Sequence, residues 1–187
     1  MIYIKSNIKW NGGKGREIKT ILSELPKTFN TYVEPFFGGG ALYWEIQPKK
    51  AIINDINSTL INYWTTVRDK PNSIKEFIHN AEDNEKYYYQ LRDNFNNKEL
   101  TLEEQAGAFY YFNRTGFNGL WRVNKSSEYN VSYDGINKRD LNFLVSDIDN
   151  YSKQLKTTQI MNDDFRNILD EVKNDESAFV FFRPFVS

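Results

Sequence analysis

Apolar residues along the chain alternate between short β-prone runs and longer stretches with helical spacing. The short runs are predicted strands, and each is followed by a turn or a polar residue. The longer stretches carry apolar positions three and four residues apart, which is typical of helices with one buried face. The predicted strands are 31–35, 50–55, 157–161 and 178–182, and the predicted helices are 16–25, 39–46, 57–68, 71–80, 84–95, 103–112, 141–154 and 165–173.

Strands that alternate with helices predict an α/β fold built on a parallel sheet. The interval 57–150 is too long for a single crossover, and from 113 to 137 its composition changes to glycine, asparagine, serine and aromatic residues. We therefore expect two parts. Residues 1–56 and 151–187 form a sheet core, and 57–150 form an inserted, mainly helical subdomain with a loop-and-hairpin region.

The stretch from Thr31 to Leu42 carries the clearest functional pattern. A β-prone run ends in Glu34, and a proline, two aromatic residues, three glycines and the start of a helix follow. Glycines allow positive φ angles and a close approach to the backbone, while a helix N-terminus offers free N–H groups. The pattern predicts a nucleotide or cofactor cradle at the end of a strand. It is not G-x-G-x-x-G and no Lys-Ser/Thr follows, which argues against a dinucleotide and ATP hydrolysis.

Carboxylates flank this predicted cradle. Asp55 ends the second strand, where it could accept hydrogen bonds from a ribose or cap the following helix. Glu34 would repel a pyrophosphate but suits a cationic ligand, and S-adenosylmethionine carries a sulfonium and an amino group. Asp164, after the third strand, could accept from an adenine amino group or cap the helix behind it. Both alternatives stay open for Asp55 and for Asp164.

Composition narrows the chemistry further. The chain has no cysteine and one histidine, His79, which argues against disulfides, a histidine-based triad and a zinc site. The net charge is −1, so any nucleic-acid binding depends on local basic patches. Two clusters are candidates: Lys5, Lys9, Lys14, Arg16 and Lys19, and Arg114, Arg122, Lys125, Lys138 and Arg139. No apolar stretch approaches the ~18 residues of a membrane span, and no signal peptide is recognised, so a cytoplasmic protein is expected.

Four motifs occur in an order that strongly resembles the Dam-type (D12 class) site-specific DNA adenine-N6 methyltransferases. They are KWNGGK at 9–14, VEPFFGGGAL at 33–42, NDIN at 54–57 and NRTGFNGLWRVN at 113–124. The resemblance spans essentially the whole chain. It implies a Rossmann-like S-adenosylmethionine-dependent methyltransferase core, with 57–150 as the target-recognition subdomain and double-stranded DNA as the partner. A restriction–modification setting fits the family, whose commonest target is GATC.

The resemblance also assigns residues to roles. It implies a cofactor pocket that contains Trp10, Lys14, Glu34, Phe36, Gly38, Gly40, Asp55, Asp164 and Phe165. It implies DNA contacts by Arg114, Asn118, Arg122 and Asn124. Arginine forks read guanine and asparagine reads adenine, which agrees with that second set.

One motif departs from the family pattern. The family's chemistry requires Asp-Pro-Pro-Tyr after the fourth strand, and this chain has Arg183, Pro184 and Phe185 there. Phe185 could still stack on a base. Arg183 has no acceptor for the adenine amino group, and its charge opposes the positive charge that develops on that amine.

We therefore expect a chain that is truncated at this motif, inactive by itself, and prone to self-association through an apolar edge strand at 178–182. Three interpretations stay open. The chain could be a methyltransferase completed by another polypeptide, a non-catalytic DNA-binding or regulatory module, or a pseudogene product.

Overall fold

The computed structural model describes residues 5–10, 17–135, 145 and 147–182. Its centre is a parallel sheet with the strand order β3-β2-β1-β4. The strands are β1 (Thr31–Glu34), β2 (Ala51–Asn54), β3 (Thr158–Met161) and β4 (Ala178–Val180). The predicted α/β fold with a parallel sheet is confirmed, although β4 ends two residues earlier than predicted.

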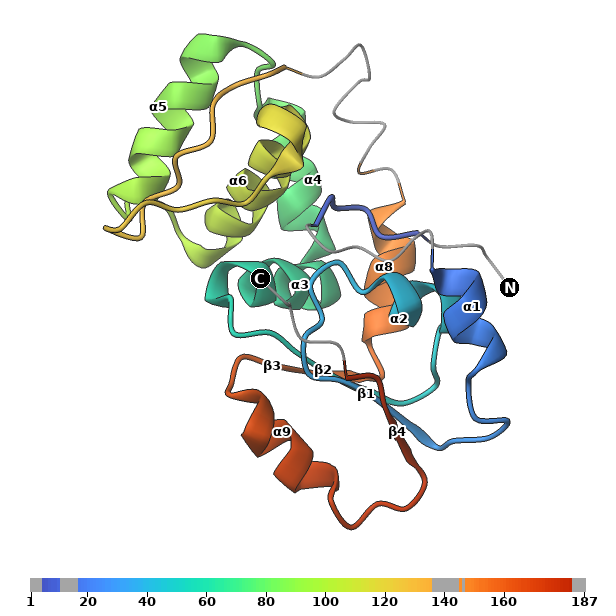
Figure 1. Cartoon of the computed structure of the whole chain (residues 1–187). Coiled ribbons are helices and arrows are strands. Elements are labelled where there is room, and N and C mark those ends of the chain that lie inside the picture. Colours follow the sequence, from blue (N-terminus) through green and yellow to red (C-terminus); the bar gives the residue numbers. More distant parts are fainter. Residues whose placement is uncertain (1–4, 11–16, 136–144, 146, 183–187) are drawn as a thin grey trace.

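Helices cover both faces of the sheet (Figure 1). On one face lie α2 (Ala41–Ile46), α3 (Ser58–Asp69) and α8 (Ile148–Leu155), with the short α1 (Ile18–Ser23) beside them. On the opposite face lies α9 (Phe165–Val172). Above α3, a further group contains α4 (Pro71–Asn80), α5 (Glu85–Asn96), α6 (Leu102–Thr115) and the 3-10 turn Phe117–Gly119.

The path of the chain creates a switch point beside β1. The chain runs outward from β1 to β2 and β3, then returns under the sheet through α9 to β4 on the other side of β1. All four strands are parallel, so their carboxyl ends share one edge of the sheet. Sheets of this kind bind ligands in the crevice outside those ends, at the point where the order reverses. That point lies between the ends of β1 and β4.

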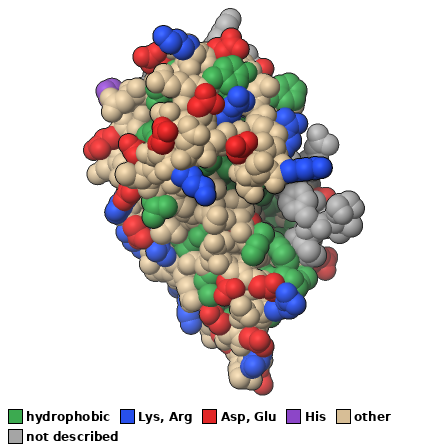
Figure 2. Space-filling view, turned by 90° about the vertical axis from the view of Figure 1, so that its left-hand side faces the viewer, with side chains coloured by type: hydrophobic (Ala, Val, Ile, Leu, Met, Phe, Trp, Pro, Cys, Tyr) green, Lys and Arg blue, Asp and Glu red, His purple; other side chains and the backbone are tan. Residues whose placement is uncertain are grey.

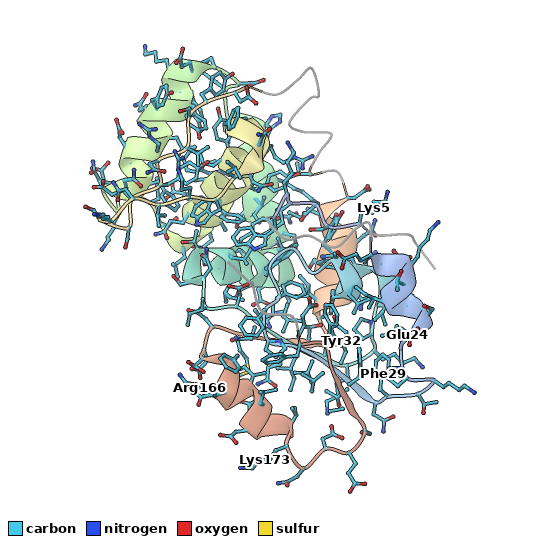
Figure 3. The ribbon with its side chains drawn as sticks, in the orientation of Figure 1. Lys5, Glu24, Phe29, Tyr32, Arg166 and Lys173 are labelled. Atoms are coloured by element: carbon cyan, nitrogen blue, oxygen red, sulfur yellow. The ribbon has the colours of Figure 1, made fainter. Side chains whose placement is uncertain are left out.

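Two hydrophobic clusters hold the layers together. Val33, Ile52, Ile168 and Val172 pack between the sheet and α9. The larger cluster joins the other face of the sheet to the helices above it and contains the aromatic residues of α2, α3 and α6. Tyr32 on β1 belongs to this larger cluster. Its ring lies beside that of Phe29, with the ring centroids 6.5 Å apart (Figure 3).

The predicted loop-and-hairpin region follows α6. Its arms meet at two isolated bridges, Gly116–Tyr133 and Val123–Tyr129, so the β-prone run 129–133 does not form a strand. Aromatic packing holds the arms in place of a continuous ladder, because Tyr129 stacks on both Phe112 and Trp121 at 4.7 Å between centroids.

Several predictions about the chain's organisation stay open. The predicted helix 141–154 falls partly outside the described residues, and α8 overlaps its described part and ends one residue later. The division into a core of 1–56 and 151–187 and a subdomain of 57–150 stays a prediction. Among the described residues β4 pairs only with β1, and self-association through its other edge also stays a prediction.

Candidate functional site

The glycine turn lies at the carboxyl end of β1, beside the switch point. Gly38 and Gly40 have φ angles of +51° and +64°, in the region that glycine adopts without strain. A Cβ on Gly38 would lie 2.5 Å from Cδ1 of Trp10, and a Cβ on Gly40 would collide with the ring of Phe37. Both the angles and the packing therefore require glycine at these two positions.

Indole groups hold the turn from the core side. The Nε1–H group of Trp64 donates to the Gly38 carbonyl at 3.0 Å, and that of Trp44 donates to the Gly39 carbonyl at 3.0 Å. Both indoles come from helices, α3 and α2, that pack on the sheet. These two carbonyls therefore have hydrogen-bond partners inside the protein and need none from a ligand.

Asp55 bridges the glycine turn and the start of α3. Its Oδ2 atom accepts from the Gly38 N–H at 2.9 Å and its Oδ1 atom accepts from the Asn57 N–H at 3.0 Å. Asn57 itself caps α3 by accepting from the Leu60 N–H. Burial raises the pKa of Asp55, and the N–H donors partly offset that rise. The carboxylate thus shapes the turn, and each oxygen retains acceptor capacity for a ligand hydroxyl.

Glu34 is a buried carboxyl group that pairs with no cation among the residues that the structure describes. Its side chain is on the same face of β1 as Tyr32, whose hydroxyl donates to Oε2 at 2.7 Å. Burial raises the pKa of Glu34 to about 8, and the charge of Asp55 adds to the rise while the Tyr32 hydrogen bond opposes it. A cationic group bound near Glu34 would lower this pKa and remove the cost of burying the charge.

Replacing Glu34 by glutamine is expected to stabilise the ligand-free protein above pH 8. The folded-state pKa of Glu34 lies above its ordinary value of 4.5, so stability falls as the pH rises from about 4.5 to about 8. The amide removes that loss while keeping an acceptor for Tyr32. Urea denaturation should give a gain on the order of 2 kcal/mol at pH 9 and almost none at pH 4.5. An equal effect at both pH values would contradict the buried-acid interpretation.

Asn54, the last residue of β2, ties three strand ends together. Its amide nitrogen donates to the carbonyls of Pro35 at 3.0 Å and Asp163 at 2.9 Å. Its side-chain oxygen accepts from the Asp163 N–H at 2.8 Å, and its backbone carbonyl accepts from the Phe37 N–H. The side chain is almost completely buried. The sequence motif contains this residue, but its structural role was not predicted.

Three phenylalanine rings meet at the same edge of the sheet, each after a different strand. Phe36 lies 5.3 Å from both Phe165 and Phe182, and Phe165 lies 5.6 Å from Phe182, between ring centroids. Phe36 and Phe165 were predicted to belong to one pocket, and the structure brings them together. Phe182, which is 46% exposed, was not predicted as part of this group.

Asp164 caps α9, one of its two predicted roles. Its Oδ1 atom accepts from the Arg166 N–H at 2.9 Å, and its carboxylate also pairs with the Arg166 guanidinium. That guanidinium holds the pKa of Asp164 well below its usual value. Arg166 lies at the start of α9 (Figure 3). The adenine contact predicted for Asp164 stays a prediction.

The remaining cofactor and catalytic residues fall into two groups. Trp10 lies against the glycine turn, as the contact with Gly38 shows. Lys14 and the Arg183-Pro184-Phe185 segment lie outside the described residues.

The four predicted DNA contacts lie on and beside the loop 116–124. Asn118 is exposed at the tip of the 3-10 turn, with φ +54°. Arg122 is exposed, and its guanidinium donates to the side chain and backbone of Asn130. Asn124 organises the hairpin end by accepting from the N–H groups of Ser126 and Glu128. Arg114 is only partly exposed and donates to the Asn7 carbonyl at 3.3 Å.

Apolar side chains accompany these polar groups, and sequence reasoning did not single them out. Phe117 is 50% exposed beside Asn118, and Val123 is exposed beside Arg122. Ile56 is 75% exposed directly after Asp55. Acidic and basic side chains intersperse on the face that carries α5 and α9 (Figure 2). The signal in the sequence that could have identified Phe117 and Val123 is an apolar residue inside an otherwise polar turn.

Two structural features are absent from the described residues 5–10, 17–135, 145 and 147–182. Within those residues, no helix is both long enough and apolar enough to cross a membrane. The same part of the chain holds no group of three or more histidine, cysteine or acidic residues with the geometry for a metal ion.

Comparisons with known proteins give a consistent result. The sequence model of the family described as D12 class N6 adenine-specific DNA methyltransferase matches residues 10–184. The type II methyltransferase M1.LlaDCHI of Lactococcus lactis subsp. cremoris is 34% identical over 98% of this chain and 66% of its own length. The type II methyltransferase M.MjaIII of Methanocaldococcus jannaschii is 36% identical over 97% of this chain and 68% of its own length.

A third relative, the DNA adenine methylase of Vibrio cholerae, is 34% identical over 70% of this chain and 48% of its own length. The chain thus spans about two thirds of the first two relatives and about half of the third.

Proposed function

We propose that this chain binds S-adenosylmethionine at the glycine turn and double-stranded DNA through the loop 116–124. The premise is that the chain belongs to the D12 class of N6 adenine-specific DNA methyltransferases. The observation that carries the proposal is the combination at the switch point. A turn that accepts only glycine lies beside two acids: Glu34, which is buried and pairs with no cation within the described part of the chain, and Asp55, which is bonded to the turn backbone.

The residues around the turn fit the parts of that cofactor. S-adenosylmethionine, when bound, supplies an electrophilic methyl group on a sulfonium ion. Glu34 would attract the positive charge of the methionine end, and Asp55 would accept from the ribose hydroxyls. Phe36 and Phe165 offer ring faces for the adenine, with Asp164 beside them. Trp10 packs against Gly38 in the turn.

The loop 116–124 offers DNA both polar and apolar groups. Asn118 and Arg122 are exposed and carry the amide and the guanidinium that read base edges. Phe117 adds an aromatic ring of the kind that enters between bases when a duplex is distorted. Arg114 and Asn124 would act from the ends of this loop. Their existing bonds to Asn7, Ser126 and Glu128 suggest that they also hold its shape.

A second candidate function is DNA binding without methyl transfer, and one observation favours it. By the resemblance of the sequence, Arg183 stands at the position of the family's catalytic acid. An arginine cannot accept a hydrogen bond from the adenine amino group, and its charge opposes the charge that develops there. Cofactor and DNA binding would survive this change, whereas methyl transfer would not.

A methyl-transfer assay separates the two functions. The 187-residue chain is incubated with tritiated S-adenosylmethionine and duplex DNA that presents adenine in every flanking context, with M.MjaIII as the positive control. We expect incorporation at least ~100-fold below the control, consistent with the loss of a catalytic hydrogen-bonding group. Incorporation at the control's rate would contradict the assignment of Arg183. Retention of labelled cofactor and labelled duplex is measured in parallel, and absence of both would contradict the proposed binding function.

A further inference from the structure

Residues Lys5–Trp10 form an N-terminal strap that lies between the upper helices and the layer of α2 and α8 (Figure 1). Ile8 is buried in the main core cluster. The hydroxyl of Tyr151 on α8 donates to the Lys5 carbonyl at 2.7 Å, and Arg114 on α6 donates to the Asn7 carbonyl. The strap therefore touches the helices on either side of it.

The strap also packs directly on the glycine turn. A Cβ on Gly38 would lie 2.5 Å from Trp10 Cδ1, and a Cβ on Gly39 would lie 3.1 Å from Ser6 Oγ. These distances leave no free space between turn and strap. Because close-packed elements cannot move independently, a ligand that fixes the turn restricts the strap as well.

Asn113, near the end of α6, joins the strap to the loop 116–124. Its Oδ1 atom accepts from the Lys9 N–H at 2.8 Å, and its Nδ2 atom donates to the Lys9 carbonyl at 2.6 Å and to the Gly119 carbonyl at 3.1 Å. Both amide hydrogens and the oxygen are used, and the residue is 1% exposed. The side chain thus makes the same kind of paired bond to Lys9 that a neighbouring strand would make.

The loop touches the strap at a second point. Gly119 has φ +65°, and a Cβ there would lie 2.5 Å from Cδ of Lys9. A continuous set of contacts consequently runs from Gly38 through Trp10 and Lys9 to Asn113 and Gly119. It begins at the proposed cofactor site and ends in the proposed DNA-facing loop.

We propose that Asn113 is a positioning residue that couples cofactor binding at the glycine turn to the order of the loop 116–124. The inference rests on the proposed function, because it requires a ligand at the turn. Binding there restricts Trp10 and the strap, and Asn113 passes that restriction to the Gly119 backbone. The loop is then already ordered when it meets DNA, so less conformational entropy is lost in that second step.

Hydrogen–deuterium exchange with and without S-adenosylhomocysteine tests this coupling. In the wild-type chain, the ligand is expected to slow exchange at least ~3-fold both in the turn 36–41 and in the loop 117–124. In Asn113→Ala, the turn should still be protected by the ligand, whereas the loop should show no change on ligand addition.

Asn96→Ala is the matched control. The Asn96 amide makes an equivalent pair of bonds to the backbone of Tyr129, donating to its carbonyl and accepting from its N–H. It therefore holds the same hairpin, but from α5 and without touching the strap. This variant should exchange faster throughout the hairpin, and the ligand should still slow the loop. Structural loosening alone would give the same result in both variants and would overturn the proposal.

The outcomes distinguish the inference from the function beneath it. Absence of protection in the wild-type turn would contradict cofactor binding itself. Protection of the turn without the loop would leave cofactor binding standing and overturn the coupling. If Asn113→Ala does not fold, Gly119→Ala interrupts the same contacts from the loop side. In that variant the loop should again lose its response to the ligand, and a retained response would contradict the coupling.

Discussion

Replacing Gly38 by alanine is expected to weaken the binding of S-adenosylhomocysteine at least about tenfold and to destabilise the protein by about 1–3 kcal/mol. The added Cβ would lie 2.5 Å from Trp10 Cδ1, and the residue has φ +51°. The backbone must therefore change its conformation or displace the indole, and both changes alter the proposed cradle. Calorimetric titration measures the affinity, and urea denaturation measures the stability.

Gly135→Ala is the control for backbone strain. Gly135 has φ +73°, but the nearest atom to its Cβ would be the Tyr133 hydroxyl oxygen at 3.3 Å, and the residue lies in the hairpin, away from the glycine turn. It should cost some stability and leave ligand affinity unchanged. If Gly38→Ala bound the ligand as tightly as the wild type, the turn would not be the cofactor site.

Asn54→Ala is expected to lower the free energy of unfolding by about 2–4 kcal/mol, more than most single substitutions. The change removes three hydrogen bonds and leaves the Pro35 and Asp163 backbone groups unpaired in a buried site. Since these groups end β1 and begin the turn before α9, ligand affinity should fall together with stability. Thermal and urea unfolding measure the first effect.

Asn162→Ala isolates the contribution of burial. Asn162 lies in the same turn as Asp163, and its amide also donates to a backbone carbonyl, that of Asp55 at 2.7 Å, but this bond is exposed to solvent. Water can replace it, so the loss should stay below about 1 kcal/mol. Equal losses for the two variants would show that Asn54 does not hold the strand ends in the way described.

The fold was predictable because local pattern and tertiary structure agree in most elements. Helix α4 spans 71–80 as predicted, since Pro71 starts it and its apolar positions repeat with helical spacing. Helix α6 instead continues three residues beyond the predicted 112, to Thr115. Asn113 and Thr115 favour turns locally, but here Asn113 bonds to the strap and the Thr115 hydroxyl donates to the Tyr111 carbonyl. Those partners satisfy the polar groups inside the protein.

The candidate site was predictable only in part. The glycine turn and the acid after β2 follow from residue type and order, and the structure brings Asp55 to Gly38 across 17 residues. The partners of the turn do not follow in this way. Trp64 contacts Gly38 and Arg114 contacts Asn7 only because the helices pack in one particular arrangement. Such pairings depend on the tertiary structure, which no local pattern records.

The polar residues predicted to face DNA illustrate the same limit. Residue type alone suggested that Arg114, Asn118, Arg122 and Asn124 act alike. The structure separates Arg114, which is only partly exposed and donates to the Asn7 carbonyl, from Asn118, Arg122 and Asn124, which are exposed. The exposed ring of Phe117 belongs with those three.

Calorimetric titration of the wild-type chain with S-adenosylhomocysteine tests the central claim most directly, because it needs neither a target sequence nor turnover. The glycine turn, the buried Glu34 and the bridging Asp55 predict saturable binding at one site, with no comparable binding of ATP or NAD. An absence of saturable heat with S-adenosylhomocysteine, or equal binding of ATP, would contradict the assignment of this switch point as a methyl-donor site.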